Sequence, residues 1–140
     1  MDNIPFAGGV NMRFHYTVAA VVMAAALAGC NTAPILNVEE APISTASGKT
    51  PNAQDVRSAI LRAGAALGWQ MRDEGPNKLV GTLNLRTHTA VVDIPYNTKT
   101  YSIQYRSSTN LNEKDGQIHK NYNGWIQNLT RGINAQLTSS

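Results

Sequence analysis

An uninterrupted apolar segment from Val18 to Ala26 limits how this chain of 140 residues can fold. The segment is too short to span the hydrocarbon core of a bilayer, which is about 30 Å thick and needs roughly 20 apolar residues as a helix. It follows a positive charge, Arg13, and it ends in small residues just before Cys30. A positive charge, an apolar run and small residues in this order are typical of a secretory signal peptide. We therefore expect residues 1–29 to be removed, so that the rest of the chain builds the fold.

The signal segment ends in Leu27-Ala28-Gly29-Cys30. This pattern resembles the lipobox of bacterial lipoproteins, and the resemblance implies cleavage between Gly29 and Cys30. It also implies that the Cys30 thiol forms a thioether to diacylglycerol and that the new amino terminus receives an acyl chain. Two or three such chains, at about 0.8 kcal/mol per buried methylene, give stable anchoring to a membrane. Apart from these covalent lipids, we expect no cofactor.

Two further features of the leader bear on its start and its destination. Residues 1–11 include Asp2, an acidic residue where a signal requires positive charge, so we interpret Met12 as the true start. Asn31 follows the cysteine. In enterobacterial lipoproteins, Asp at this position tends to retain the protein at the inner membrane. By that resemblance, Asn31 favours a lipid-anchored location in the cell envelope, at the outer membrane and facing the periplasm.

Cysteine count and charge exclude several classes of protein. Cys30 is the only cysteine, so neither an intramolecular disulfide nor a cysteine-only metal cluster can form. The formal net charge is +3, and we interpret it as an ordinary solvated surface, with weak attraction to anionic lipid head groups as the alternative. Nucleic acid is not an expected partner, because the chain is exported and lacks a basic stripe interleaved with aromatic residues.

The segment after the cysteine is rich in Ala, Pro, Ser and Thr. This composition predicts that residues 30–49 comprise the lipidated cysteine and a flexible tether. A short edge strand inside the tether is the alternative for Ile43-Ser44-Thr45.

A helix is expected after the tether. Thr50 is a suitable N-cap, and Pro51 suits the first helical position because its missing N–H is not needed there. Gly68 is the expected left-handed residue after the helix. One apolar stripe with helical spacing runs between these ends and consists of Val56, Ile60, Ala63 and Leu67.

Four segments with alternating apolar residues follow, at residues 69–72, 79–86, 90–96 and 101–106. A polar loop is expected over residues 107–117, and a second amphipathic helix follows it. Gly124 and Gly132 lie inside that helix, where close packing on the sheet would explain them. Together these patterns predict a single α+β domain over residues 50–140. Two helices would pack on one face of a roughly four-stranded antiparallel sheet, in the order (β)αββββα.

Three stretches of the domain carry a second resemblance. They are residues 86–96, residues 101–105 and residues 118–129, the last of which contains Tyr122 and Trp125. They are similar to a group of small proteobacterial lipoproteins, and the similarity covers most of the mature domain. The resemblance implies the same fold and the same envelope location, and it brings no catalytic residue to this chain.

The chemistry-bearing residues do not form a recognisable catalytic or metal motif. His88, His119 and Asp93 could only make a metal site if the fold gathered them, because none has ligand spacing, so we expect no metal. A Gly-x-Ser-x-Gly nucleophile motif is missing, and Glu39 and Glu40 lie in the expected tether rather than at a cleft. We therefore expect a protein that is not an enzyme.

Aromatic residues are concentrated in the second half of the chain. They are interpreted as core residues whose polar tips reach the surface. The alternative is a ligand groove between the last helix and the sheet, with aromatic walls and with Arg or His at its mouth. The residues of this groove would be Arg86, His88, Tyr96, Tyr105, Tyr122 and Trp125.

Two functions follow from these expectations. The first is a membrane-anchored, non-enzymatic binding or assembly module that contacts another envelope protein or a glycan. The alternative is a small-molecule or lipid carrier or sensor domain in the periplasm, with a closed pocket in its core. An exposed apolar patch favours the first function, and an enclosed apolar cavity favours the second.

Overall fold

The structure is a computed structural model that describes residues 31–140. The expected signal peptide, residues 1–29, and Cys30 lie outside the described residues. Asn31–Ser140 form one unit. In chain order its elements are β1 (Thr32–Pro34), β2 (Val38–Pro42), α2 (Ala53–Ala66), β3 (Trp69–Asp73), β4 (Lys78–Leu85), β5 (His88–Pro95), β6 (Thr100–Thr109), β7 (Gln117–His119) and α3 (Lys120–Thr138).

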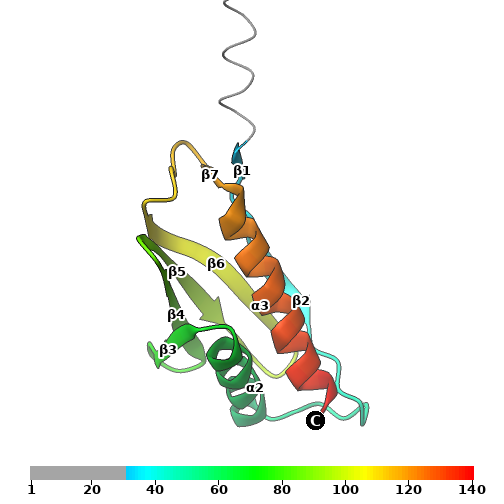
Figure 1. Cartoon of the computed structure of the whole chain (residues 1–140). Helices are drawn as coiled ribbons and strands as arrows, with labels where there is room; N and C mark the ends of the chain where they lie inside the picture. The colour runs from blue at the N-terminus through cyan, green and yellow to red at the C-terminus, as the bar shows by residue number, and fades with distance from the viewer. Residues whose placement is uncertain (1–30) are drawn as a thin grey trace, which may run out of the picture. The chain divides into compact units, whose positions relative to one another are not determined.

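The main sheet has five antiparallel strands in the order β2-β6-β5-β4-β3 (Figure 1). Strands β3 to β6 form a meander and correspond to the four alternating segments of the sequence. Strand β2 adds a fifth strand at the edge, and β1 pairs with β7 in a separate two-stranded sheet. The predicted α+β class and the order of strand, helix, strands and helix are confirmed.

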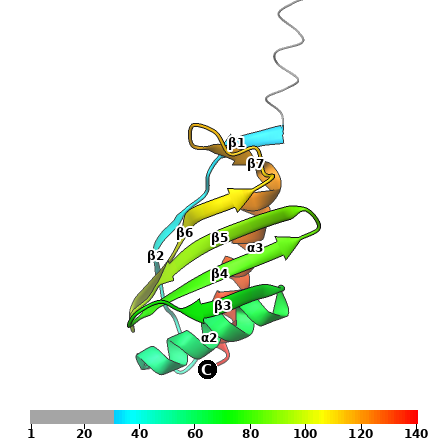
Figure 2. The ribbon, with the colours of Figure 1, turned by 90° about the vertical axis from the view of Figure 1, so that its left-hand side faces the viewer.

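The core lies between one face of the main sheet and the two helices. Alternation in the strands directs Leu79, Val92 and Ile103 to this face, and each is fully buried. Figure 2 shows α3 behind the sheet and α2 along its β3 edge. Polar contacts also join the layers: the Tyr101 hydroxyl donates to Asn134 Oδ1 at 2.7 Å, and Arg57 of α2 pairs with Asp73 of β3.

The first helix starts later than expected. Its N-cap is Asn52, not Thr50, so Pro51 lies before the helix rather than at its first position. Asn52 Oδ1 accepts from the Asp55 backbone N–H at 2.8 Å, and the Asn52 N–H donates back to Asp55 Oδ2 at 3.3 Å. This reciprocal capping box satisfies two backbone donors, which explains why Asn52 is the cap. Gly68, with φ of +85°, has the left-handed conformation that was predicted.

The two glycines of α3 have different surroundings. A Cβ on Gly132 would lie 3.4 Å from both Ala63 Cβ and Leu67 Cδ1, so Gly132 allows α3 to approach α2 and not the sheet. A Cβ on Gly124 would have no atom within 4 Å. The expectation of close packing on the sheet is therefore wrong for both residues, because the tight contact of α3 is with the other helix.

The first half of the segment expected to be a tether contains two strands, β1 and β2. Strand β1 pairs with β7, with Thr32 opposite His119, and β2 pairs with β6, with Val38 opposite Ile103. The edge strand is Val38–Pro42, and Ile43-Ser44-Thr45 lies after it. Flexibility is thus the wrong description of residues 32–42. The composition is that of a linker, but backbone pairing and side-chain hydrogen bonds hold this segment to the domain.

Candidate functional site

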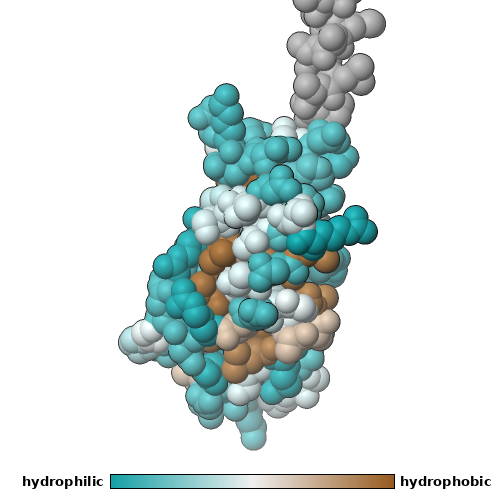
Figure 3. All heavy atoms as spheres, turned by 60° about the vertical axis from the view of Figure 1, so that its left-hand side comes forward, coloured by the Kyte–Doolittle hydropathy of each residue, from teal (hydrophilic) through white to brown (hydrophobic). Residues whose placement is uncertain are grey.

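The most exposed apolar surface of the described residues lies where α2, β3, β4 and α3 meet. Leu67 is 40% exposed and Leu85 is 46% exposed. Leu67 also lines a small notch with Trp69, Leu83, Trp125 and the polar Asn128. Leu85 does not line this notch, but it lies two residues after Leu83 on the same face of β4. We call the four apolar side chains of the notch, together with Leu85, the apolar notch. Figure 3 shows apolar residues gathered in the middle of one face of the domain, bordered by hydrophilic residues.

Local structure explains why the apolar notch is open. Leu67 is the C-cap of α2, and Gly68 turns the chain sharply into β3, so the Leu67 side chain lies beyond the last helical turn. Leu85 is the last residue of β4 and lies opposite His88, past the point where β3 begins beside β4. Neither leucine is covered by a following element. The volume of the notch is about 50 Å³, enough for a small side chain.

The six residues expected to line a groove lie at four separate places in the described domain. Tyr96 follows one end of β5 and His88 begins the other. These ends are about 25 Å apart at roughly 3.3 Å per residue. Arg86 lies in the turn beside His88, and Trp125 is in the apolar notch. One groove cannot therefore contain all six side chains.

Tyr122 and Tyr105 belong to the core. Their rings meet edge to face with centroids 5.6 Å apart, and Tyr122 is fully buried. The Tyr105 hydroxyl lies 2.9 Å from the Ser108 hydroxyl. The Tyr122 hydroxyl has no hydrogen-bond partner among the described residues, and burial raises its pKa. Tyr122 is thus part of the core, half-buried Tyr105 packs against it, and the Tyr105 hydroxyl is already engaged by Ser108.

The unpaired Tyr122 hydroxyl leads to a prediction. Tyr122→Phe removes a buried polar atom while keeping the ring that packs on Tyr105. We expect the free energy of unfolding to stay the same or to rise by about 1 kcal/mol, because an unsatisfied buried hydroxyl carries a desolvation cost. Urea unfolding followed by tryptophan fluorescence measures the change. Tyr101→Phe is the matched control, and it should lower stability because Tyr101 donates to Asn134.

The two histidines of the described residues have structural partners. His88 Nδ1 lies 2.7 Å from the Asn110 carbonyl oxygen, and Asn110 Nδ2 donates to Thr87 Oγ1 at 2.8 Å. These contacts tie the β4–β5 turn to the loop after β6. His119 is the N-cap of α3, and its Nδ1 accepts from the Asn121 N–H at 3.2 Å. Within residues 31–140, no group of three or more His, Cys, Asp or Glu side chains could hold a metal ion.

A cluster of charged side chains lies on the sheet face opposite the helices. Glu74 accepts hydrogen bonds from Arg106 at 2.9 Å and from Lys78 at 3.3 Å. Asp93 lies 3.2 Å from Arg106 and 3.6 Å from Lys78. The hydrogen bond from Arg106 is the main cause that lowers the pKa of Glu74 to about 2, although desolvation opposes it.

The lowered pKa of Glu74 predicts a pH dependence of stability. A carboxylate with a depressed folded-state pKa stabilises the fold above its ordinary pKa of 4.5, and this contribution is lost as pH falls towards about 2. We expect the stability difference between the wild type and Glu74→Gln to be constant near neutral pH and to shrink between these values. Chemical unfolding at a series of pH values tests this. The same difference for Glu113→Gln, an exposed loop residue, should change less over that range.

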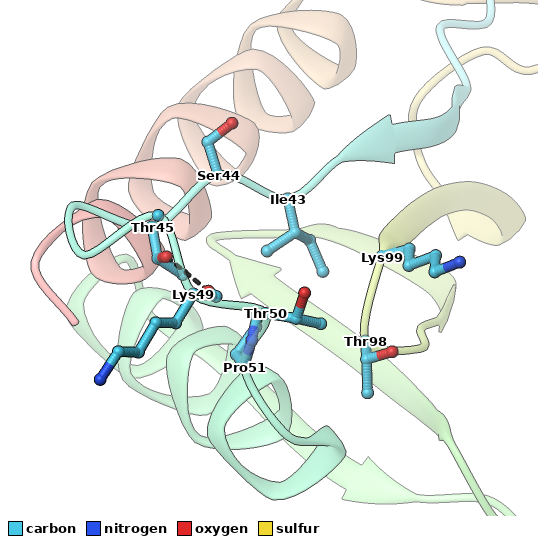
Figure 4. A pocket seen from close by; sticks show the side chains of 9 residues that line it. Ile43, Ser44, Thr45, Lys49, Thr50, Pro51, Thr98 and Lys99 are labelled. Carbon is cyan, nitrogen blue, oxygen red and sulfur yellow. Dashed lines mark hydrogen bonds between the residues drawn. The ribbon is translucent and has the colours of Figure 1, made fainter.

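Other hollows on the domain are open and polar. One of about 310 Å³ lies between the β2–α2 connection and the turn before β6 (Figure 4). The side chains of Lys49 and Lys99 border it and point away from it (Figure 4). Thr45 Oγ1 donates to the Lys49 carbonyl oxygen at 2.7 Å, so this hydroxyl is already engaged. The hollow therefore does not present a converging set of ligand-binding groups.

Sequence patterns did not identify most of the apolar notch. Leu67 continues the apolar stripe of α2 and was expected in the core. Leu85 continues the apolar pattern at every second residue of β4, whose earlier members are buried. The signal that could identify them is their position at the end of each element, next to the turns at Gly68 and Arg86.

No helix in residues 31–140 combines the length and apolar character needed to cross a membrane. No protein-family model, curated protein or solved structure matches this chain.

Proposed function

We propose that this chain is a lipid-anchored protein of the bacterial cell envelope whose domain is a non-enzymatic binding or assembly module. The observation that carries the proposal is the boundary of the domain. The folded unit begins at Asn31, the residue after Cys30. Cleavage before Cys30 would therefore leave the whole unit, with one residue ahead of it to carry the lipid. The lipobox-like sequence ends at the residue before the described unit begins.

The lipid chemistry follows from the motif. Diacylglycerol on the Cys30 sulfur and an acyl chain on its amino group are the groups that this motif receives in bacterial lipoproteins. The membrane is thus the first partner of the mature protein, and Asn31 favours the outer membrane, with the domain in the periplasm. The charged cluster around Glu74 and the polar surface hollows suit a domain surrounded by water.

The apolar notch supports a binding role. Its exposed leucines and half-buried Trp125 form an apolar surface that no element of the described domain covers. A volume of about 50 Å³ suits one apolar side chain of a partner protein and is too small for a drug-sized ligand. These properties favour a contact with an envelope protein over carriage of a small molecule.

The anchor is tested by the mass of the mature protein purified from membranes. Intact mass should correspond to residues 30–140 plus diacylglycerol and one acyl chain, and a tagged fatty acid supplied in the medium should be incorporated. Fragmentation should place the lipid on Cys30. A mature protein without lipid, or with lipid at another residue, contradicts the proposal.

The binding role predicts a specific effect of the exposed leucines. Leu85→Ser should reduce cross-linking of the lipidated protein to its envelope partner several-fold, because it removes apolar area from the apolar notch. Stability should change little, since Leu85 is 46% exposed. Gln127→Ser, at an exposed position of α3, is the control and should cross-link as the wild type does. Equal cross-linking yields for Leu85→Ser and Gln127→Ser would count against the apolar notch as the binding site.

A further inference from the structure

The first residues of the domain are held firmly in place. Strand β1 begins at Thr32 and pairs with β7 through Pro34, which lies opposite Gln117. The Ile35 N–H donates to the Gly116 carbonyl oxygen at 2.9 Å and continues this backbone pairing. The chain is therefore fixed from the second residue after Cys30 onwards.

Two asparagine side chains hold the next residues. Asn123 of α3 accepts from the Leu36 N–H through Oδ1 and donates to the Pro34 carbonyl oxygen through Nδ2, each at 2.9 Å. Asn37 Oδ1 accepts from the Tyr105 N–H of β6 at 2.8 Å. The Asn123 side chain therefore satisfies one backbone donor and one backbone acceptor of this segment, as a neighbouring strand would do. Between β1 and β2 the chain thus has little freedom to extend.

These contacts leave almost no spacer between the expected anchor and the fold. Two residues of extended chain reach about 7 Å. The polar head-group region on each side of a bilayer is about 5 to 8 Å thick, from roughly 30 Å of hydrocarbon within 40–45 Å in total. A domain tied to a lipid by two residues cannot stand clear of that layer.

We propose, on the basis of the proposed lipid anchor, that the mature domain rests directly on the phospholipid head groups through its β1–β7 end and keeps one orientation there. The contact surface consists of β1, β7 and the loop 110–116. Figure 1 places β1 and β7 at the opposite end of the domain from the C-terminus. Helix α3 has 19 residues and is about 28 Å long at 1.5 Å per residue. The C-terminal end of α3 therefore faces away from the bilayer.

The chemistry of the β1–β7 end fits head groups and not hydrocarbon. Its exposed charged residues are Glu113, Lys114, Asp115 and Lys120, so acidic and basic groups balance. A balanced surface gains little from anionic lipid, and the contact is set by the length of the anchor. The same orientation is expected on phosphatidylcholine vesicles and on vesicles that also contain phosphatidylglycerol.

Orientation can be measured with spin labels, because Cys30 is the only cysteine and lipidation consumes its thiol. Lys114→Cys places a label at the loop 110–116, and Ser139→Cys places one at the far end of α3. The lipidated proteins are reconstituted in vesicles whose head groups carry a nickel chelate. Relaxation should be enhanced several-fold more at position 114 than at position 139, in both lipid mixtures.

A longer spacer provides the matched control. Ten Gly and Ser residues inserted between Cys30 and Asn31 add a mean reach of about 17 Å, and the ratio of the two relaxation rates should fall towards one. Asn123→Ala should lower the ratio in part, whereas Gln127→Ala should not. If the lipid is present by mass but both labels relax equally without the insertion, the orientation is overturned and the anchor stands. If Cys30 carries no lipid, the proposed function itself fails.

Discussion

Replacing Cys30 by serine is expected to abolish fatty-acid incorporation. Every protein molecule that has lost residues 1–29 (the leader-free protein) should then move into the aqueous fraction. A serine hydroxyl does not replace the thiol that forms the thioether in this class of protein. Each sixteen-carbon chain contributes roughly 12 kcal/mol of membrane affinity at about 0.8 kcal/mol per methylene. Loss of two or three chains therefore changes the distribution between membrane and water by many orders of magnitude.

The measurement has two parts, a fatty-acid label and a separation of membranes from soluble protein. Chains that keep residues 1–29 are identified by their mass and counted separately, because the apolar segment Val18–Ala26 can hold them at the membrane. Asn31→Ser is the matched control, since it introduces the same residue one position later and should keep both the label and the membrane location. Leader-free Cys30→Ser protein in the membrane fraction, at the level of the control, would contradict the lipid anchor.

The meander of β3 to β6 was predictable because apolar residues recur at every second position of its strands, most clearly in β5. The buried residues Ala90, Val92 and Ile94 alternate along β5 with half-exposed residues. Turn residues mark the limits of the strands, and Asn77 has the positive φ that such turns use. Local pattern and tertiary environment agree here, so the sequence alone is sufficient.

Strands β1, β2 and β7 could not be predicted in the same way. Strands β1 and β7 have three residues each, which is too short for an alternating pattern. Strand β2 has five residues, but Glu39 and Glu40 at its centre and Pro42 at its end interrupt the alternation. Its position depends on bonds to distant residues, such as the one from Ser102, whose hydroxyl accepts from the Glu40 N–H at 2.9 Å. Contacts between segments so far apart in the chain leave no periodic signal.

The candidate site was predicted in part. Alternation correctly indicates that aromatic side chains face the helices, but it says nothing of which residues the helices leave uncovered. His88 begins β5 and Tyr96 follows its last residue, so the two side chains lie at opposite ends of this strand. Trp125 was expected in a groove and does line the apolar notch. The position of α3 along the sheet decides these outcomes, and it is set by packing against α2, for example at Gly132.

Replacing Gly64 by leucine should lower the free energy of unfolding by about 2–3 kcal/mol. A Cβ at this position would lie 2.5 Å from Met71 Cε and 3.5 Å from Trp69 Cβ. Met71 also lies against Gly81 of β4, because a Cβ built on Gly81 would lie 2.9 Å from the Met71 sulfur. The methionine thus fills the space between two glycines, and a leucine on α2 must displace the Met71 side chain or push the helix away from β3. The better helix propensity of leucine offsets only about 1 kcal/mol of this cost.

Urea unfolding of four proteins tests whether Met71 is the cause: the wild type, Gly64→Leu, Met71→Ala and the double variant. Met71→Ala alone should destabilise by creating a cavity. In the double variant the leucine can occupy that cavity, so the combined loss should be smaller than the sum of the single losses. Gly124→Leu is the matched control on α3, where a Cβ would have no atom within 4 Å, and it should not destabilise. Strictly additive losses would show that the cost at Gly64 arises elsewhere than at Met71.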